Sequence, residues 1–143
     1  MLLKYGPTVG LVAVAFALGL FAGRGADVRA QGRTRVFELR TYTAPEGQLG
    51  ALESRFRDHT LRIFEKHGMT NVGYWIPADS PRSENTLIYI LAHESRDAAK
   101  VSWAAFGQDP EWRTVAEESQ KDGRIVSSVE SVFMNATDFS AIK

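Results

Sequence analysis

The chain has 143 residues, and its 17 basic and 17 acidic side chains give it a formal net charge of zero. Hydrophobic residues make up 44% of the chain and charged residues 24%, which is the ordinary range for a globular domain, and the length suits one domain. The balanced charge provides no basic footprint for nucleic acid, and the absence of cysteine excludes disulfide scaffolds, thiolate metal sites and a cysteine nucleophile.

The first 30 residues have the composition of an export signal. Lys4 precedes a charge-free stretch, residues 5–23, that is apolar on every helical face, and small residues stand at the −3 and −1 positions of a cut after Ala30. This order predicts a signal peptide cleaved after Ala30. The stretch is also close to the roughly 20 residues that cross a bilayer, so an uncleaved membrane anchor is the alternative. In both cases we expect an exported domain, periplasmic or secreted, with residues 31–35 as a tether.

The domain itself, residues 36–143, begins with a predicted strand at 36–43, where β-branched and aromatic side chains alternate. Alternation divides this strand into two faces, one with Phe37, Leu39 and Thr41, the other with Glu38, Arg40 and Tyr42. We expect the apolar first set to pack under helices and the second set to lie on the uncovered face of the sheet.

The next elements follow from changes in hydrophobic period. From Gln48, apolar side chains recur at three- and four-residue steps, which predicts an amphipathic helix that ends where Gly68 can adopt a left-handed conformation. Strands are predicted at 71–76 and 86–92, on either side of a proline-containing loop. The second of these strands is almost continuously apolar, so we expect burial on both of its faces.

A second helical segment is predicted in two parts. Ser95 can cap the first part, Gly107 interrupts it, and Asp109 followed by a proline can cap the second. A last strand covers residues 125–134. The resulting order, βαββαβ, predicts an α+β fold of the ferredoxin-like type, an antiparallel sheet with both helical segments on one face.

Helices on one face of such a sheet leave the other face to solvent or to a partner. Tyr74 and Glu130 are candidates for this uncovered face, together with Glu38, Arg40 and Tyr42. A sheet face of this kind is typically buried when two copies pair into a closed barrel. We therefore expect a homodimer with a pocket between sheet and helix.

Several stretches of the sequence resemble the NIPSNAP family: FELRTYT at 37–43, FRDHT at 56–60, FEKHG at 64–68, GYW at 73–75 and WAAFGQDPEW at 103–112. They span roughly residues 35–138 in the order and spacing of the family. One departure is Gly107, where relatives often carry a basic residue. The resemblance implies a dimeric α+β barrel. It implies no single activity, because the wider superfamily includes cofactor-free monooxygenases, haem-degrading proteins and small-molecule isomerases.

The histidines are the first candidates for chemistry. His59 and His67 lie eight positions apart on one predicted helix and His93 ends a strand, but no H-x-x-x-H or H-x-E spacing occurs, so we expect no metal site. His59 is the best candidate for a general base or a haem ligand, because it lies near the apolar stripe and follows Asp58. The alternative is a structural histidine with satisfied hydrogen bonds.

Polar strand residues are the second candidates. Arg40 and Tyr42 could bind a carboxylate or an enolate, or Arg40 could instead form a cross-strand ion pair with Glu38 or Glu130. Tyr74 could line a ligand pocket, although aromatic residues on strands more often belong to the core. The predicted ligand pocket comprises Glu38, Arg40, Tyr42, His59, Tyr74 and Glu130.

Two classes of function remain, because the sequence has no nucleophile elbow, phosphate loop, dinucleotide fingerprint or paired catalytic acids. The first is a binding or interaction module for a small apolar or aromatic molecule, without cofactor. The second is a cofactor-independent monooxygenase or isomerase that uses His59 with Arg40 and Tyr42. Convergence of these three side chains on one cavity would favour the enzyme, whereas internal ion pairs would favour the module, which we prefer.

Overall fold

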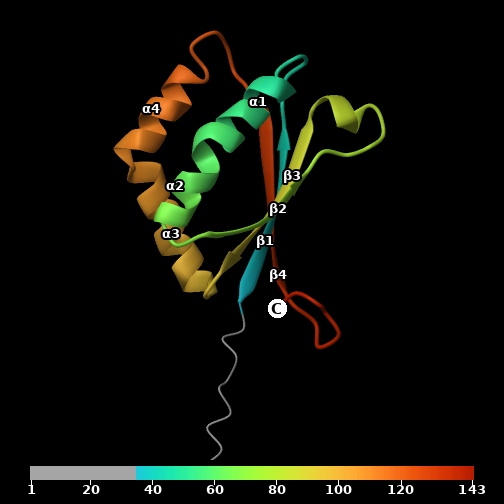
Figure 1. Ribbon diagram of the computed structural model, residues 1–143, viewed down its shortest axis with the longest axis vertical. Helices are drawn as coiled ribbons and strands as arrows, with labels where there is room; N and C mark the ends of the chain where they lie inside the picture. The colour runs from blue at the N-terminus through green and yellow to red at the C-terminus, as the bar shows by residue number, and fades with distance from the viewer. Residues whose placement is uncertain (1–34) are drawn as a thin grey trace, which may run out of the picture.

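Four antiparallel strands form one sheet in the computed structural model, which describes residues 35–143 (Figure 1). The strands are β1 (Val36–Thr43), β2 (Thr70–Trp75), β3 (Thr86–His93) and β4 (Ser128–Asn135). They lie in the order β2-β3-β1-β4, so β1 is paired on both sides and β4 is an edge. This is the ferredoxin-like order that the sequence predicts.

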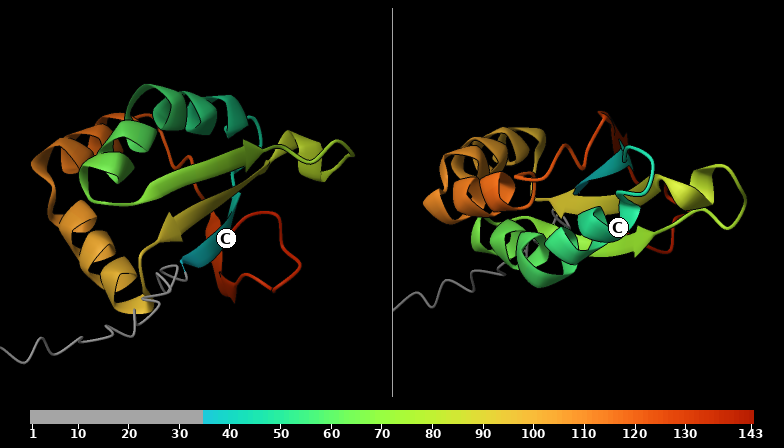
Figure 2. Two further views of the ribbon diagram at one scale, coloured as in Figure 1. Left: turned by 60° about the horizontal axis from the view of Figure 1, so that its bottom comes forward. Right: turned by 90° about the horizontal axis from the view of Figure 1, so that it is seen from above.

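Two helical segments cover one face of this sheet (Figure 2). The first consists of α1 (Leu49–Arg55), a five-residue π-helix η1 (Phe56–Thr60) and α2 (Leu61–Lys66). The second consists of α3 (Arg96–Gln108) and α4 (Pro110–Glu118), and a short 3-10 turn, η2 (Arg82–Glu84), lies between β2 and β3. The predicted α+β class and the placement of both segments on one face are confirmed.

Side-chain caps explain where the second segment begins and restarts. The Ser95 hydroxyl accepts a hydrogen bond from the backbone N–H of Ala98 at 3.0 Å, and the Asp109 carboxylate accepts one from Glu111 at 2.8 Å. Pro110 occupies the first position of α4, where its missing N–H costs nothing. Both caps agree with the sequence prediction.

The first segment is less regular than its periodicity predicts. It ends as expected at Gly68, which has a φ of 77°, a left-handed conformation that suits glycine. Between α1 and α2, however, η1 follows a wider turn. The Thr60 hydroxyl donates to the backbone carbonyl of Arg55, five residues earlier, at 3.1 Å. Hydrophobic spacing does not distinguish such a turn from a regular one, so the sequence predicted a single continuous helix.

The set of β1 side chains that faces the helices is the opposite of the predicted one. Glu38, Arg40 and Tyr42 face the helices: the Trp103 indole of α3 donates to Glu38, and the ring centroid of Tyr42 lies 5.5 Å from that of Phe56. The uncovered face carries the other set of β1 side chains, Phe37, Leu39 and Thr41.

Hydrogen bonding explains this reversal. Glu38 can be buried because β3, α3 and β4 supply hydrogen-bond donors to it, whereas Leu39 and Thr41 lie on the face that no helix covers. Tyr74 also faces the helices, against expectation, and its ring stacks on Tyr89 with centroids 5.2 Å apart. Glu130 lies on the uncovered face, opposite Thr41 of β1.

The core between sheet and helices is built around Tyr89 of β3, which is completely buried. Its ring centroid lies 5.1 to 6.0 Å from those of four other aromatic side chains, Tyr42, Phe56, Phe64 and Tyr74. Strand β3 was predicted to be buried on both faces. Its helix-facing side chains are buried, but Ile88 and Ile90 on the other face stay partly exposed, which again marks that face as uncovered.

The predicted export signal or anchor of residues 1–30 lies outside the described residues, as does the tether apart from Arg35. From residue 35 onward, the structure contains no helix with the length and hydrophobicity needed to traverse a bilayer.

Candidate functional site

A buried carboxylate lies at the centre of the sheet–helix interface. Glu38 is only 1% exposed and accepts four hydrogen bonds from three strands and a helix. Arg40 Nη1 and Ser131 Oγ each lie 2.7 Å from Oε1, while Trp103 Nε1 lies 2.7 Å and His93 Nε2 3.0 Å from Oε2. We call these five residues the Glu38 network.

The network keeps Glu38 ionised. Burial by itself raises the pKa of this carboxyl, but the hydrogen bonds from His93, Ser131, Trp103 and Arg40 lower it to about 2. Because an ionised carboxylate only accepts hydrogen bonds, His93 donates through Nε2. At neutral pH Glu38 thus has no proton to give, and donors already occupy both of its oxygens, so the arrangement is structural.

Several polar atoms in this interior lack a hydrogen-bond partner. Within residues 35–143 the buried atoms without one are Arg40 Nε, Arg55 Nε, Tyr89 Oη and His93 Nδ1. Burial raises the pKa of Tyr89 well above its ordinary value, so its phenol stays protonated. Arg40 stacks on Trp103, with Cζ 4.2 Å from the ring centroid. The interior between sheet and helices therefore has unused hydrogen-bonding capacity.

His59 lies elsewhere. It is exposed on η1 and lines a groove of about 530 Å³ between α1, η1 and α4. The wall of this groove is formed by Ala51, Ser54, Arg55, Asp58, His59, Thr114, Val115, Glu118, Ser119 and Lys121. Arg40 and Tyr42 are not among them. The three candidate catalytic side chains do not converge on one cavity.

The other two histidines have carboxylate partners. His67 Nε2 lies 2.6 Å from Asp109 Oδ2, and the same carboxylate accepts from Lys66 at 2.7 Å, which joins α2 to the start of α4. Hydrogen bonds from Lys66 and His67 hold the pKa of Asp109 well below its usual range. Among residues 35–143, no three histidine, aspartate or glutamate side chains are grouped closely enough to hold a metal ion.

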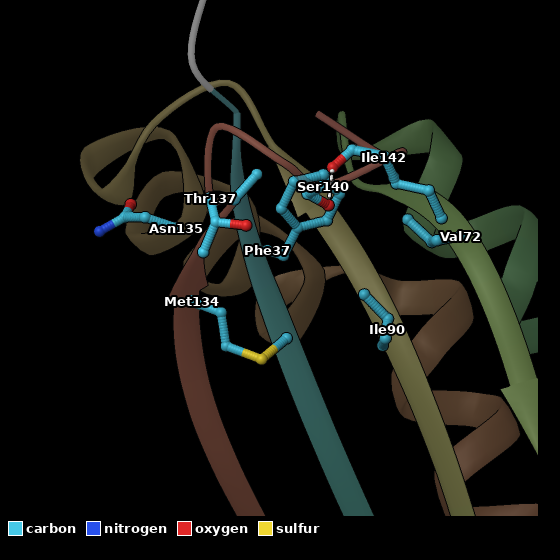
Figure 3. Close-up of a pocket in the computed structure, with 9 residues that line it drawn as sticks. Phe37, Val72, Ile90, Met134, Asn135, Thr137, Ser140 and Ile142 are labelled. Atoms are coloured by element: carbon cyan, nitrogen blue, oxygen red, sulfur yellow. Dashed lines mark hydrogen bonds between the residues drawn. The ribbon is translucent and has the colours of Figure 1, made fainter.

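The uncovered sheet face carries a separate, apolar pocket of about 310 Å³ (Figure 3). Phe37, Val72, Ile90 and Met134 supply its floor from the four strands, and the chain after β4 folds across it. Farther along this face, apolar side chains are open: Trp75 is 51% exposed and Val132 is 55% exposed.

Sequence reasoning did not assign four residues to these sites. His93 was considered only as a metal ligand, although simple alternation places it on the same face of β3 as Tyr89. Arg55 follows Leu52 by three residues and so lies on the inner side of α1, although charged residues of that helix were expected on its outer side. No local pattern marks Trp103 or Ser131, because their role depends on Glu38 in another element.

Comparison with known proteins relates the whole domain to others of the same fold. A sequence model of the NIPSNAP family matches residues 37–141. The structure is similar to that of a NIPSNAP family protein of unknown function from Agrobacterium tumefaciens, with 24% identity and a TM-score of 0.68 over 78% of this chain and 96% of that chain. No protein of curated function matches the sequence.

More distant similarity in fold extends to oxygenases. A monooxygenase from Streptomyces coelicolor, solved in complex with the ligand nanaomycin D, has 15% identity and a TM-score of 0.55 over 78% of this chain and 95% of that chain. SnoaB, a cofactor-independent oxygenase from Streptomyces nogalater, has 14% identity and a TM-score of 0.50 over 77% and 99% of the two chains. At this level of identity the likeness concerns the fold alone.

Proposed function

This chain belongs to the NIPSNAP family, within the dimeric α+β barrel superfamily, and from that starting point we propose that it is an exported, homodimeric module that binds a small molecule. The observation that carries this choice is the commitment of Arg40 to Glu38. The Nη1 atom of Arg40 lies 2.7 Å from this buried carboxylate, and the ion pair offsets the positive charge that would polarise a substrate carbonyl.

The separation of the candidate catalytic groups supports the same choice. A general base has to lie within hydrogen-bond reach of the proton that it removes. His59 is on the exposed side of η1, whereas Arg40 and Tyr42 lie against the core aromatic cluster. The alternative function, a cofactor-independent monooxygenase or isomerase, draws its support from the fold shared with SnoaB.

Small-molecule binding is supported by the groove, whose wall includes Arg55 with its unpartnered Nε. A groove of about 530 Å³ falls within the range of ~300–1,000 Å³ typical of ligand sites. The related Streptomyces coelicolor monooxygenase, of the same fold, carries the ligand nanaomycin D. Pairing of two copies through the uncovered face would bury Trp75 and Val132, large apolar side chains that water otherwise reaches.

Export is proposed from the sequence. The basic start, the apolar middle and the small residues before Gln31 form one coherent signal, and cleavage after Ala30 would release the domain. Retention of residues 5–23 as an anchor would leave the same domain on the same side of the membrane.

Native mass spectrometry of the chain recovered from the exported fraction of its source cell tests the proposal in one measurement. We expect a dimer that begins at Gln31 and retains a defined additional mass. A monomer would overturn the barrel dimer, and an empty dimer would favour an interaction module over a small-molecule binder. Conversion of the retained molecule by the purified dimer would establish the enzyme instead.

A further inference from the structure

Arg55 is a buried cation without a counter-ion. Arg55 is 6% exposed, and within residues 35–143 no carboxylate forms an ion pair with its guanidinium. Its one hydrogen bond joins Nη1 to Ser119 Oγ at 3.5 Å, the limit of a hydrogen bond, and its Nε is buried without a partner. The Cζ atom lies 5.2 Å from the ring centroid of Trp112. This stacking is the main contact that offsets burial of the charge.

The other buried arginine provides a contrast within the same interior. Arg40 is paired with Glu38 at 2.7 Å, whereas burial lowers the pKa of Arg55 against weaker opposing effects of Tyr42 and Tyr89. A buried guanidinium is normally paired, because removal of a charge from water is costly. Arg55 is thus a position where an anion from outside the chain would gain a charge-assisted hydrogen bond.

Arg55 lies where a ligand can reach it. It forms part of the wall of the groove between α1, η1 and α4, in which Ala51 and Val115 are the apolar residues. Two carboxylates line the groove, Asp58 and Glu118; both are exposed, and Glu118 pairs with Lys121 at 3.9 Å. The unusual turn η1 starts directly after Arg55, and π-turns recur at functional sites.

We propose that this groove binds an organic anion, an apolar molecule that carries one carboxylate, with that carboxylate on the guanidinium of Arg55. One unpaired cation matches one negative charge, and Ala51 and Val115 give the apolar part of the ligand a wall to contact. The planar fork of arginine suits a carboxylate held by two parallel hydrogen bonds. The inference rests on the proposed binding function and specifies its ligand class.

A matched pair of probes tests the charge. The exported chain is titrated by calorimetry with 1-naphthoate and with 1-naphthamide, which share a shape and differ in charge. We expect naphthoate to bind about 10-fold more tightly or better. Arg55→Met should reduce naphthoate affinity to that of the amide without changing amide affinity. Arg57→Met replaces an exposed arginine of η1 and should change neither the naphthoate affinity nor the amide affinity.

Each other outcome is decisive. Equal affinities for acid and amide would overturn the anion site and leave the proposed binding module standing. Binding of neither probe would overturn the anion site as well, whereas the retained mass in the native spectrum would still report on the module. If inorganic phosphate binds the groove as tightly as naphthoate does, the site recognises anions in general, and the proposed preference for an apolar carboxylate is wrong. If Arg55→Met does not fold, Arg55→Lys must still weaken naphthoate selectively, and an unchanged ratio would refute the proposal.

Discussion

The indole nitrogen of Trp103 lies 2.7 Å from Oε2 of Glu38, so a single hydrogen bond joins α3 to the central strand β1 through the interior of the domain. The acceptor is a charged carboxylate at 1% exposure, which makes the bond stronger than one between neutral groups. Helix α3 is therefore held to the sheet by a polar contact as well as by the aromatic core.

Removal of this donor should destabilise the domain. Trp103→Phe keeps an aromatic ring but leaves Oε2 with His93 alone, and we expect a loss of about 1–3 kcal/mol in the free energy of unfolding, measured with urea. Trp112→Phe is the control for the loss of ring volume, since Trp112 packs against Phe106, makes no bond to the Glu38 network, and is replaced by a ring that can still face Arg55. Equal losses in the two variants would show that ring volume, not the hydrogen bond, determines the effect.

The free energy of unfolding of the domain should decrease at acidic pH because of Glu38. Its folded pKa of about 2 is lower than the ordinary value of 4.5, so the contribution of its ionised form is fully present above pH 4.5 and is lost as the pH falls towards 2. We expect this group to account for roughly 2 kcal/mol of the loss. Unfolding curves of the wild type and Glu38→Gln at pH 7, 4 and 3 should converge as the pH falls. Parallel curves would contradict the assignment.

The uncovered face should control association. Val132→Asp places a charge at a 55% exposed position of that face, and we expect the dissociation constant of the proposed dimer to rise ~100-fold or more while the fold persists. Val101→Asp is the control, at a valine of α3 that is 70% exposed and lies on the helical side of the domain. Sedimentation over a concentration series measures both. An unchanged constant in Val132→Asp would place the interface elsewhere.

Gly73 should fix the position of Trp75. An added Cβ at residue 73 would lie 2.5 Å from the Trp75 ring, so Gly73→Ala has to displace that ring from the sheet. We expect a shift in tryptophan fluorescence and weaker association, because Trp75 is part of the uncovered face. Gly50→Ala, where a Cβ has open space in a helix, should instead stabilise the chain by about 0.5–1 kcal/mol. Unaltered fluorescence in Gly73→Ala would show that Trp75 does not cover this glycine in solution.

His59→Ala separates the two functional classes. Because the side chain is exposed, the free energy of unfolding should change by less than about 0.5 kcal/mol. In a binding module anchored on Arg55, affinity for 1-naphthoate should stay within about threefold of the wild type. Abolition of ligand conversion with unchanged stability would instead identify His59 as a base of the alternative enzyme.

The element order was predictable because strands and helices impose different hydrophobic periods, and the caps at Ser95 and Asp109 are local. The covered face of β1 was not predictable in the same way. Alternation shows that two faces differ, but the face that is buried depends on donors such as His93 and Ser131, which lie 55 and 93 residues from Glu38 along the chain. Polar side chains therefore entered the core where the pattern alone favoured the surface.

The same limit applies to the candidate site. The sequence predicted His59 as a general base because it lies near an apolar stripe, but its side chain is exposed on η1. Arg55 was overlooked because charged residues on an amphipathic helix usually face water. What distinguishes it, the lack of a counter-ion in a buried position, is a property of the assembled helices α1 and α4 and not of any one segment.

Strand β1 lies between β3 and β4, although it is synthesised first of the four and β4 last. Until β4 has left the ribosome, and has crossed the membrane if the domain is exported, β1 has one open edge. An incomplete chain would thus present a hydrogen-bonding edge next to Phe37 and Leu39, a combination that invites pairing with other chains. Folding of this domain should therefore be completed only once β4 is available, and a nascent chain that stalls before β4 should depend on chaperones to remain soluble.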